Sequence, residues 1–121
     1  FARIYDLFDG NYQKISSLMS GVSYSDSQIR DTMAKCYHAN DYILDPHGAC
    51  GYQALKDMLL DGETGVFCET AHPAKFKSTV DAAIDGDVKI PERLAAFMRG
   101  TKQSVSMSKD FDAFKSFLMA E

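Results

Sequence analysis

Apolar residues recur at helical spacing along most of the chain. Apolar side chains three or four positions apart are typical of an amphipathic helix. The pattern predicts helices over residues 2–8 and 12–19, and further helices after Ser25, from Pro91 and after Ser108. Ser25 and Gln28 have the spacing of a capping box, in which the serine caps the helix and the glutamine reaches back. The chain is therefore predicted to be rich in short helices.

Three short segments break this helical pattern and are predicted to be strands. Residues 42–44 (Tyr-Ile-Leu) are followed by a polar turn and by a helix that ends near Gly62. Residues 64–68 (Thr-Gly-Val-Phe-Cys) are followed by a second polar turn, and Pro73 then begins a helix, a position that proline favours. Residues 103–107 are a third candidate strand. The first two segments each form a strand, turn and helix unit.

Two consecutive units of this kind predict parallel strands joined by a right-handed crossover. Their turns then open at the same edge of the sheet, where ligands bind in α/β folds. The expected fold class is α/β: a helix-rich fragment with two or three parallel strands from a larger three-layer αβα sheet. A helical hairpin segment is expected over residues 1–22 and the α/β part over residues 23–121. The turns bring four polar residues towards one cleft: Asp45, His47, Thr70 and His72.

Composition excludes several classes of protein. The 121 residues are 45% hydrophobic, as in globular proteins, and the net charge is −4 without a basic run, so a nucleic-acid-binding role is not expected. The uninterrupted apolar stretches are too short to span a membrane. Three cysteines without framework spacing predict free thiols in a reducing compartment, here the cytoplasm. Because the first residue is phenylalanine, we expect a fragment or a trimmed chain.

Cysteine and histidine chemistry offers two weaker readings. The spacings His47-x-x-Cys50 and Cys68-x-x-x-His72 supply the ligand types of a tetrahedral zinc site. However, Cys68 lies in an apolar run and Cys50 in the first turn of a helix, where free cysteines are commonly buried small hydrophobes. A nucleophilic cysteine also needs an exposed, electropositive setting, which Cys68 beside an acidic residue lacks. Neither a metal site nor a cysteine hydrolase is predicted.

Two separated motifs carry a family resemblance. Residues 44–49 (Leu-Asp-Pro-His-Gly-Ala) and residues 69–76 (Glu-Thr-Ala-His-Pro-Ala-Lys-Phe) resemble the C-terminal part of threonine synthases. The match is specific between about Tyr42 and Ile84. The resemblance implies the tryptophan-synthase-β-like fold, the cofactor pyridoxal 5'-phosphate, and the conversion of O-phospho-L-homoserine and water to L-threonine and phosphate.

The resemblance also implies that the site is incomplete. The lysine that binds the cofactor covalently and the glycine loop that cradles its phosphate would lie upstream. We therefore expect a C-terminal fragment with no catalytic residue of its own, inactive alone. Lys75 is not a substitute for the missing lysine, because it lies in the first turn of a charged helix and is expected to be solvated.

Residue roles follow from the resemblance, with alternatives from the residues themselves. By its motif position Thr70 contacts the pyridine nitrogen of the cofactor; the alternative is a threonine that caps the next helix. Asp45 is placed beside the cofactor ring; the alternative is a carboxylate at a helix N-terminus. His47 and His72 are candidates for the substrate pocket, and each could instead hold its turn by hydrogen bonds.

Two other functional classes stay open at this stage. One is a free-standing binding module that kept the scaffold without catalysis, and the other is a small metal-stabilised structural domain. Strands from a larger sheet would have unpaired edges, which can form hydrogen bonds with another chain. We therefore expect the isolated chain to self-associate.

Overall fold

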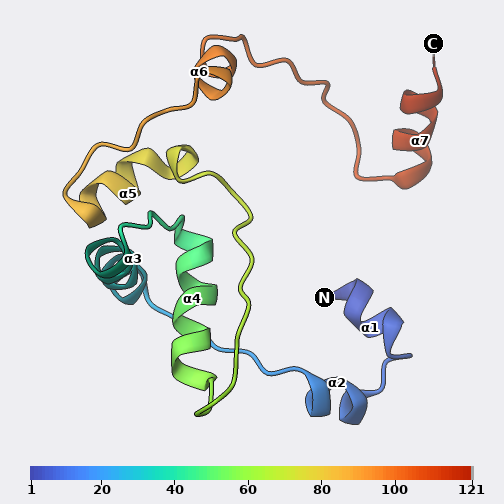
Figure 1. The fold of residues 1–121 in the computed structure, drawn as a ribbon. Coiled ribbons are helices and arrows are strands. Elements are labelled where there is room, and N and C mark those ends of the chain that lie inside the picture. Colours follow the sequence, from blue (N-terminus) through green and yellow to red (C-terminus); the bar gives the residue numbers. More distant parts are fainter. Residues whose placement is uncertain (121) are drawn as a thin grey trace. The chain divides into compact units, whose positions relative to one another are not determined.

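The computed structural model describes residues 1–120 and divides the chain into two compact units. The first unit, Phe1–Lys89, holds most of the helices, and the second begins at Ile90 (Figure 1). The helices of the first unit are α1 Ala2–Leu7, α2 Tyr12–Leu18, α3 Asp26–Asn40, α4 Pro46–Met58, the 3₁₀ helix η1 Pro73–Phe76, and α5 Lys77–Ile84. The second unit has α6 Glu92–Met98 and α7 Phe111–Met119.

Helix α3 is the centre of the first unit. It begins at the predicted capping box: the Ser25 side chain accepts a hydrogen bond from Gln28 N, and Gln28 Oε1 accepts one from Ser25 N at 2.9 Å. Such reciprocal bonds satisfy two N–H groups that the first turn leaves without helical partners. The helix ends at Asp41, which adopts a left-handed conformation with φ 53°. Helix α3 packs against both α4 and α5.

The core lies where these three helices meet. Met33, Leu44 and Val80 are fully buried. A hydrogen bond of 3.1 Å from Thr32 Oγ1 to Gln53 Oε1 also joins α3 to α4. Burying apolar surface of this kind is the main force that stabilises a fold, so these contacts fix the position of α4. The N-cap and first turn of α4 carry two of the residues discussed below, Asp45 and His47.

The predicted strands are absent from the described residues 1–120, so the expected α/β sheet fragment is wrong. Residues 42–44, 64–68 and 103–107 all lie outside helices and strands. The reason is that a strand needs a neighbour for its ladder of hydrogen bonds, and a parallel sheet needs several. No backbone hydrogen bond joins residues 64–71 to another segment of the described chain.

Residues 64–71, the extended segment, nevertheless keep the side-chain alternation of a strand. Gly65, Phe67 and Glu69 are partly buried, whereas the residues between and after them are exposed: Val66, Cys68 and Thr70. A period of two is the signature of extended backbone. The hydrophobic pattern thus indicates extended backbone, but the predicted strand is wrong, because the neighbour of this segment is a helix and not another strand.

That neighbour is α4, and the extended segment runs antiparallel to it (Figure 1). Gly65 lies against Leu55 and Leu59 near the end of the helix, and Glu69 lies against Gly48 in its first turn. Between them, the ring of Phe67 meets that of Tyr52 edge to face, with centroids 5.7 Å apart. The contacts place the end of the extended segment beside the start of α4.

Several predicted helix boundaries shift in the structure. Helix α4 ends at Met58, before Gly62, and Gly62 forms a turn with φ 86°. The last helix is capped by Asp110 and not by Ser108: Asp110 Oδ1 accepts a hydrogen bond from Ala113 N at 2.9 Å. A carboxylate two residues beyond the serine is an equally good cap, so the pattern alone could not choose between them.

Candidate functional site

Asp45 begins α4 and is completely buried. Its Oδ1 atom accepts a hydrogen bond from His47 N at 2.9 Å, which makes it the N-cap of the helix. Pro46 occupies the next position, where a missing N–H costs nothing. The alternative anticipated for Asp45, a carboxylate at a helix N-terminus, is therefore what the structure shows. Its second oxygen, Oδ2, is buried without a hydrogen-bond partner among the described residues.

His47 lies on the same turn and remains mostly exposed. Its Nδ1 atom is 3.1 Å from Asp45 Oδ1, while 66% of its side chain is accessible. The imidazole also packs at a tilt against Phe76, with ring centroids 5.1 Å apart. His47 thereby links the start of α4 to η1. Its Nε2 atom makes no hydrogen bond within residues 1–120, so it is available to a ligand.

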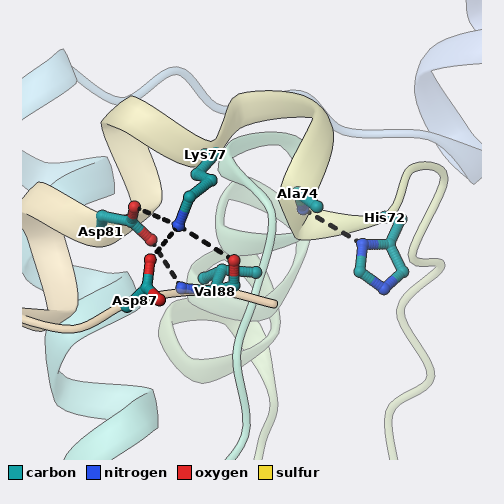
Figure 2. Close-up of polar contacts among 6 residues, drawn as sticks. All are labelled: His72, Ala74, Lys77, Asp81, Asp87 and Val88. Carbon is teal, nitrogen blue, oxygen red and sulfur yellow. Dashed lines mark hydrogen bonds and ion pairs between the residues drawn. The ribbon is translucent and has the colours of Figure 1, made fainter. Parts of the chain in front are cut away.

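His72 holds the second turn. Its Nδ1 atom accepts a hydrogen bond from Ala74 N at 3.1 Å, which caps η1 (Figure 2). Pro73 has no N–H, so Ala74 offers one of the first free amides of this turn. Because Nδ1 is the acceptor, the ring proton of the neutral form is on Nε2. The ring is exposed, so this Nε2–H donor faces solvent.

Thr70 lies two residues before this cap, on the exposed face of the extended segment. Its hydroxyl makes no hydrogen bond to any described residue, and His72 already caps the following helix. The alternative role as a helix cap is thus taken by another side chain. What remains is a free hydroxyl at the end of an extended segment, able both to donate and to accept a hydrogen bond.

Glu69 is the residue that the sequence did not single out. Both of its carboxyl oxygens are buried without a hydrogen-bond donor among residues 1–120. Burial, the Asp45 carboxyl, which can share a hydrogen bond with Glu69 once one of the two is protonated, and the charge of Asp45 together raise the pKa of Glu69 to about 7, against a smaller opposing effect of the Asp45 backbone N–H. Burial acts to raise the pKa of Asp45 as well, but the neighbouring Glu69 carboxyl, as a donor when protonated, and the hydrogen bonds from His47 outweigh it, and the pKa falls below 3.8.

A signal for Glu69 was present in the pattern. It shares the odd-numbered register of Gly65 and Phe67, so an extended reading already places all three on the inward face. The same segment leads to a cavity of about 600 Å³ beside α4. Its lining comprises Cys36, Asn40, Tyr42, Tyr52, Phe67 and Glu69.

The structure brings together some of the predicted site residues and separates others. Asp45 and His47 are in direct contact, and Glu69 joins them at the start of α4. Thr70, the next residue, faces outwards. His72 contacts Ala74, and no hydrogen bond within the described chain joins it to the other three predicted residues. The turns are linked through Glu69 at Gly48 and through the packing of His47 against Phe76, with the acidic side chains inward and the Thr70 hydroxyl outward.

A polar cluster on α5 supports the second turn (Figure 2). Lys77 Nζ donates to Asp81 Oδ2 at 2.6 Å, to Val88 O at 3.0 Å, and to the Asp87 carboxylate. Asp81 also accepts a hydrogen bond from Val88 N at 2.8 Å. The cluster ties the chain after α5 back to the start of that helix, directly behind η1.

Other chemistries find no support in the described part of the chain. Within residues 1–120, no group of three or more His, Cys, Asp or Glu side chains is placed to hold a metal ion. Cys68 is exposed on the same face as Thr70, contrary to the burial expected for it, and Lys75 is exposed too. None of the described helices has the length and apolar character needed to cross a bilayer.

Comparisons with known proteins agree with the two motifs. The family model described as "Threonine synthase, C-terminal" matches residues 48–118. Threonine synthases from Haemophilus influenzae and Serratia marcescens are 38% and 35% identical over 117 residues, which is 97% of this chain and 27% of each relative. The chain thus spans about a quarter of the length of these relatives.

Solved structures show the same likeness. The crystal structure of threonine synthase from Escherichia coli matches 97% of this chain and 27% of that one, with a TM-score of 0.74 and 32% identity. A structure of threonine synthase with bound PLP, from Brucella melitensis, matches 95% of this chain and 30% of its own, with a TM-score of 0.61; at 19% identity this shows a shared fold. By its motifs, its family match and its fold, the chain belongs to the threonine synthase C-terminal family.

Proposed function

We propose that this chain is the C-terminal part of a threonine synthase and that it supplies Thr70 to the pyridine nitrogen of pyridoxal 5'-phosphate. The observation that carries the proposal is the free, outward-facing hydroxyl of Thr70 in the matched motif. The whole enzyme would convert O-phospho-L-homoserine and water to L-threonine and phosphate. Its compartment would be the cytoplasm, which suits the three free cysteines.

The residues present fit this cofactor. A hydroxyl can donate to the ring nitrogen without transferring a proton, which leaves that nitrogen largely unprotonated. When bound, pyridoxal phosphate supplies the electron sink for the reaction, and the protein tunes it through such contacts. Thr70 has no competing hydrogen bond among the described residues. A carboxylate at the same place would instead favour a protonated ring.

The other predicted residues fall into supporting positions. Asp45 is completely buried, so its part in the cofactor site is to hold the turn beside the ring. His47 and His72 each use Nδ1 to hold a turn and leave Nε2 free. Both therefore remain candidates for contact with the substrate: the Nε2–H group of neutral His72 can donate to a phosphate or carboxylate oxygen, whereas Nδ1 of His47 donates to Asp45, so Nε2 of neutral His47 is an acceptor.

The test is phosphate release from O-phosphohomoserine by the full-length protein that contains this chain. Thr70→Val removes the hydroxyl with little change in volume and should lower kcat about tenfold or more, the equivalent of one lost hydrogen bond. Thr70→Ser should keep most of the activity. The matched control is Thr64→Val, an exposed threonine on the same segment, which should behave as the native protein.

Two results would contradict the proposal. Absence of phosphate release by the native full-length protein would remove the activity itself. Equal kcat values for the Thr70→Val and Thr64→Val variants would remove Thr70 from the cofactor site. The absorbance of bound cofactor gives a second readout, because a changed contact at the ring nitrogen alters its spectrum even where turnover is unchanged.

Partners of the isolated chain form a separate prediction. Val66 is 85% exposed on the extended segment, and the backbone groups there lack a ladder. Such an edge is a template for pairing with another chain. We expect the purified 121-residue chain to self-associate in sedimentation velocity experiments, and Val66→Lys to weaken that association. A monomer over a wide concentration range would contradict this expectation.

A further inference from the structure

The starting point is a buried oxygen atom that has no partner. Asp45 is fully buried, and its Oδ1 atom is used by His47 N and by the His47 ring. Its Oδ2 atom has no hydrogen bond to any described residue. A buried polar atom without a partner costs free energy, so a nearby donor is expected. The mechanism proposed above does not use this atom.

Glu69 is the group that faces Asp45. A Cβ atom added at Gly48, in the first turn of α4, would overlap the carboxyl carbon and both carboxyl oxygens of Glu69. The absence of a side chain at Gly48 therefore lets this carboxyl group approach the start of α4. There it lies within hydrogen-bonding reach of the cap residue, Asp45, and neither of its own oxygens has a side-chain or backbone hydrogen bond to residues 1–120.

Two ionised carboxylates are not stable in this arrangement. Each would be desolvated, and the two charges would repel each other. If one of them carries a proton, that proton can be donated across the pair, and Asp45 Oδ2 gains the partner that it lacks. Asp45 accepts bonds from His47, so Glu69 is the side that holds the proton.

No positively charged side chain among the groups that line the Glu69 cavity could neutralise the two carboxylates in place of a shared proton. His47 approaches the other oxygen of Asp45 and is mostly exposed. The remaining titratable groups around the Glu69 cavity come from α3, from the chain before α4 and from α4 itself: Cys36, Tyr42 and Tyr52. None of these is a cation. The amide groups at the start of α4 favour negative charge, which suits the ionised Asp45.

We propose that Glu69 and Asp45 share one proton, and that this carboxylic acid–carboxylate bond fixes the end of the extended segment on α4 so that Thr70 faces the cofactor. Glu69 is then a positioning residue that acts through its neighbour. The part that concerns Thr70 rests on the function proposed above, whereas the shared proton does not.

The alternation of the extended segment gives the link between the two residues. Successive side chains in extended backbone point to opposite faces, so anchoring Glu69 inwards directs Thr70 outwards. The raised pKa of Glu69 and the lowered pKa of Asp45 agree with one proton held on the Glu69 side. Loss of that proton would place two charges at the start of α4 and loosen the anchor.

The first experiment follows the carboxyl carbon of Glu69 by ¹³C NMR during a pH titration of the full-length protein. Loss of the signal in Glu69→Gln assigns it. We expect Glu69 to titrate near pH 7, well above its ordinary value of 4.5. Titration near 4.5 would overturn the shared proton.

A pair of glycine variants tests the geometry with little change to the fold. Gly48→Ala adds the atom that displaces the Glu69 carboxyl group, and should return its titration towards 4.5. Gly51→Ala lies one turn later, where the added Cβ would be 3.4 Å from Phe67 Cβ, an ordinary contact, and should leave the titration near 7. If Glu69 titrated at the same pH in both variants, the close approach of its carboxyl group to Gly48 would be contradicted.

The second experiment tests the positioning role through kcat and its pH profile. We expect kcat of the native protein to decline above pH 7, as Glu69 loses its proton. Glu69→Gln keeps a donor for Asp45 but cannot titrate, so its kcat should stay near native and lack this decline. Glu69→Ala should lower kcat about tenfold, because a small misplacement of a reacting group has effects of this size. Glu63→Gln, an exposed glutamate before the segment, is the control.

The outcomes separate the two proposals. Native protein without phosphate release would end the proposed function, and the NMR titration would still decide the shared proton. Active protein in which Glu69→Gln and native enzyme have the same pH profile would overturn the positioning role. A Glu69→Ala protein that fails to fold leaves the decision to Glu69→Gln and to the glycine variants.

Discussion

The two units of the chain have similar helices but different interiors. Both contain short helices that carry apolar side chains at helical spacing. In the first unit apolar side chains form a core, in which Met33 of α3, Leu44 just before α4 and Val80 of α5 are fully buried. Within residues 90–120 no residue is buried, and α7 leaves Phe117 48% and Leu118 63% exposed. The same pattern thus has two outcomes.

The difference shows what an amphipathic pattern specifies. The pattern predicts a helix and identifies its apolar face, but it does not specify the surface against which this face packs. Helix α3 has neighbours on two sides within its unit, α4 and α5. Exposed apolar faces such as that of α7 mark sites of association in folded proteins. Stability should therefore be concentrated in the first unit.

The sharpest test compares the same substitution in both units. Leu44→Ala removes a fully buried side chain and should lower the free energy of unfolding by about 2–5 kcal/mol, as cavities in protein cores do. Leu118→Ala removes an exposed side chain and should cost less than about 0.5 kcal/mol. Urea unfolding followed by circular dichroism measures both.

Hydrogen exchange of peptides from the two units shows where each substitution acts. Leu44→Ala should increase exchange in α3 and α4. If the two leucine variants were equally destabilised, the contrast between the units would be wrong, and Leu118 would be covered in solution.

A second difference is the carboxyl pair, which belongs to the first unit. The pKa of Glu69 is raised to about 7, so its contribution to stability is complete below 4.5 and is lost as the pH rises through 7. The pKa of Asp45 is lowered, so its contribution is complete above 3.8 and is lost as the pH falls through the folded value. The contribution of the pair is greatest between pH 3.8 and 4.5.

Stability of the native chain should accordingly fall by roughly 1–3 kcal/mol as the pH rises from that window to above 7. Urea midpoints at a series of pH values measure this. Glu69→Gln should flatten the decline, because glutamine does not titrate. A decline of the same size in this variant would assign it to other groups.

The smallest expected effect comes from the polar cluster on α5. Lys77→Met breaks the bonds to Asp81, Asp87 and the Val88 carbonyl, and should lower the melting temperature slightly, by less in high salt because ions screen exposed pairs. Lys115→Met, an exposed lysine of α7, is the matched change in the second unit and should have no effect. If the Lys77→Met and Lys115→Met variants had equal melting temperatures, the cluster would not stabilise α5.

Local signals were sufficient for most of the helices. Ser25 and Gln28 cap α3 as their spacing predicts, and Pro73 begins a helical turn. Such signals succeed because a cap involves residues close in sequence. The strands failed for the opposite reason: a ladder needs a second segment, and the apolar run at 64–68 carries no information about which neighbour it has. In the structure the neighbour of this segment is helix α4.

The candidate site likewise contains residues that local motifs predict and one residue that depends on a contact distant in sequence. The motifs singled out Asp45, His47, Thr70 and His72, whose roles at a cofactor site stay predictions, and they anticipated that a carboxylate could lie at a helix start. They left open whether Thr70 caps the next helix or His72 holds its turn by a hydrogen bond, and in the structure His72 is the cap of η1. Glu69 was missed because its burial depends on the gap at Gly48, a contact across 21 positions of sequence.

The alternating extended segment makes the chain more tolerant of changed side chains than of changed length. Deleting one residue between Gly65 and Phe67 would exchange the inward and outward faces of everything between the deletion and the next anchor, since the side-chain period is two. The hydroxyl would then turn towards α4 and the acid towards solvent. Insertions and deletions here should therefore be rarer in nature than substitutions, and those that persist should come in pairs of residues.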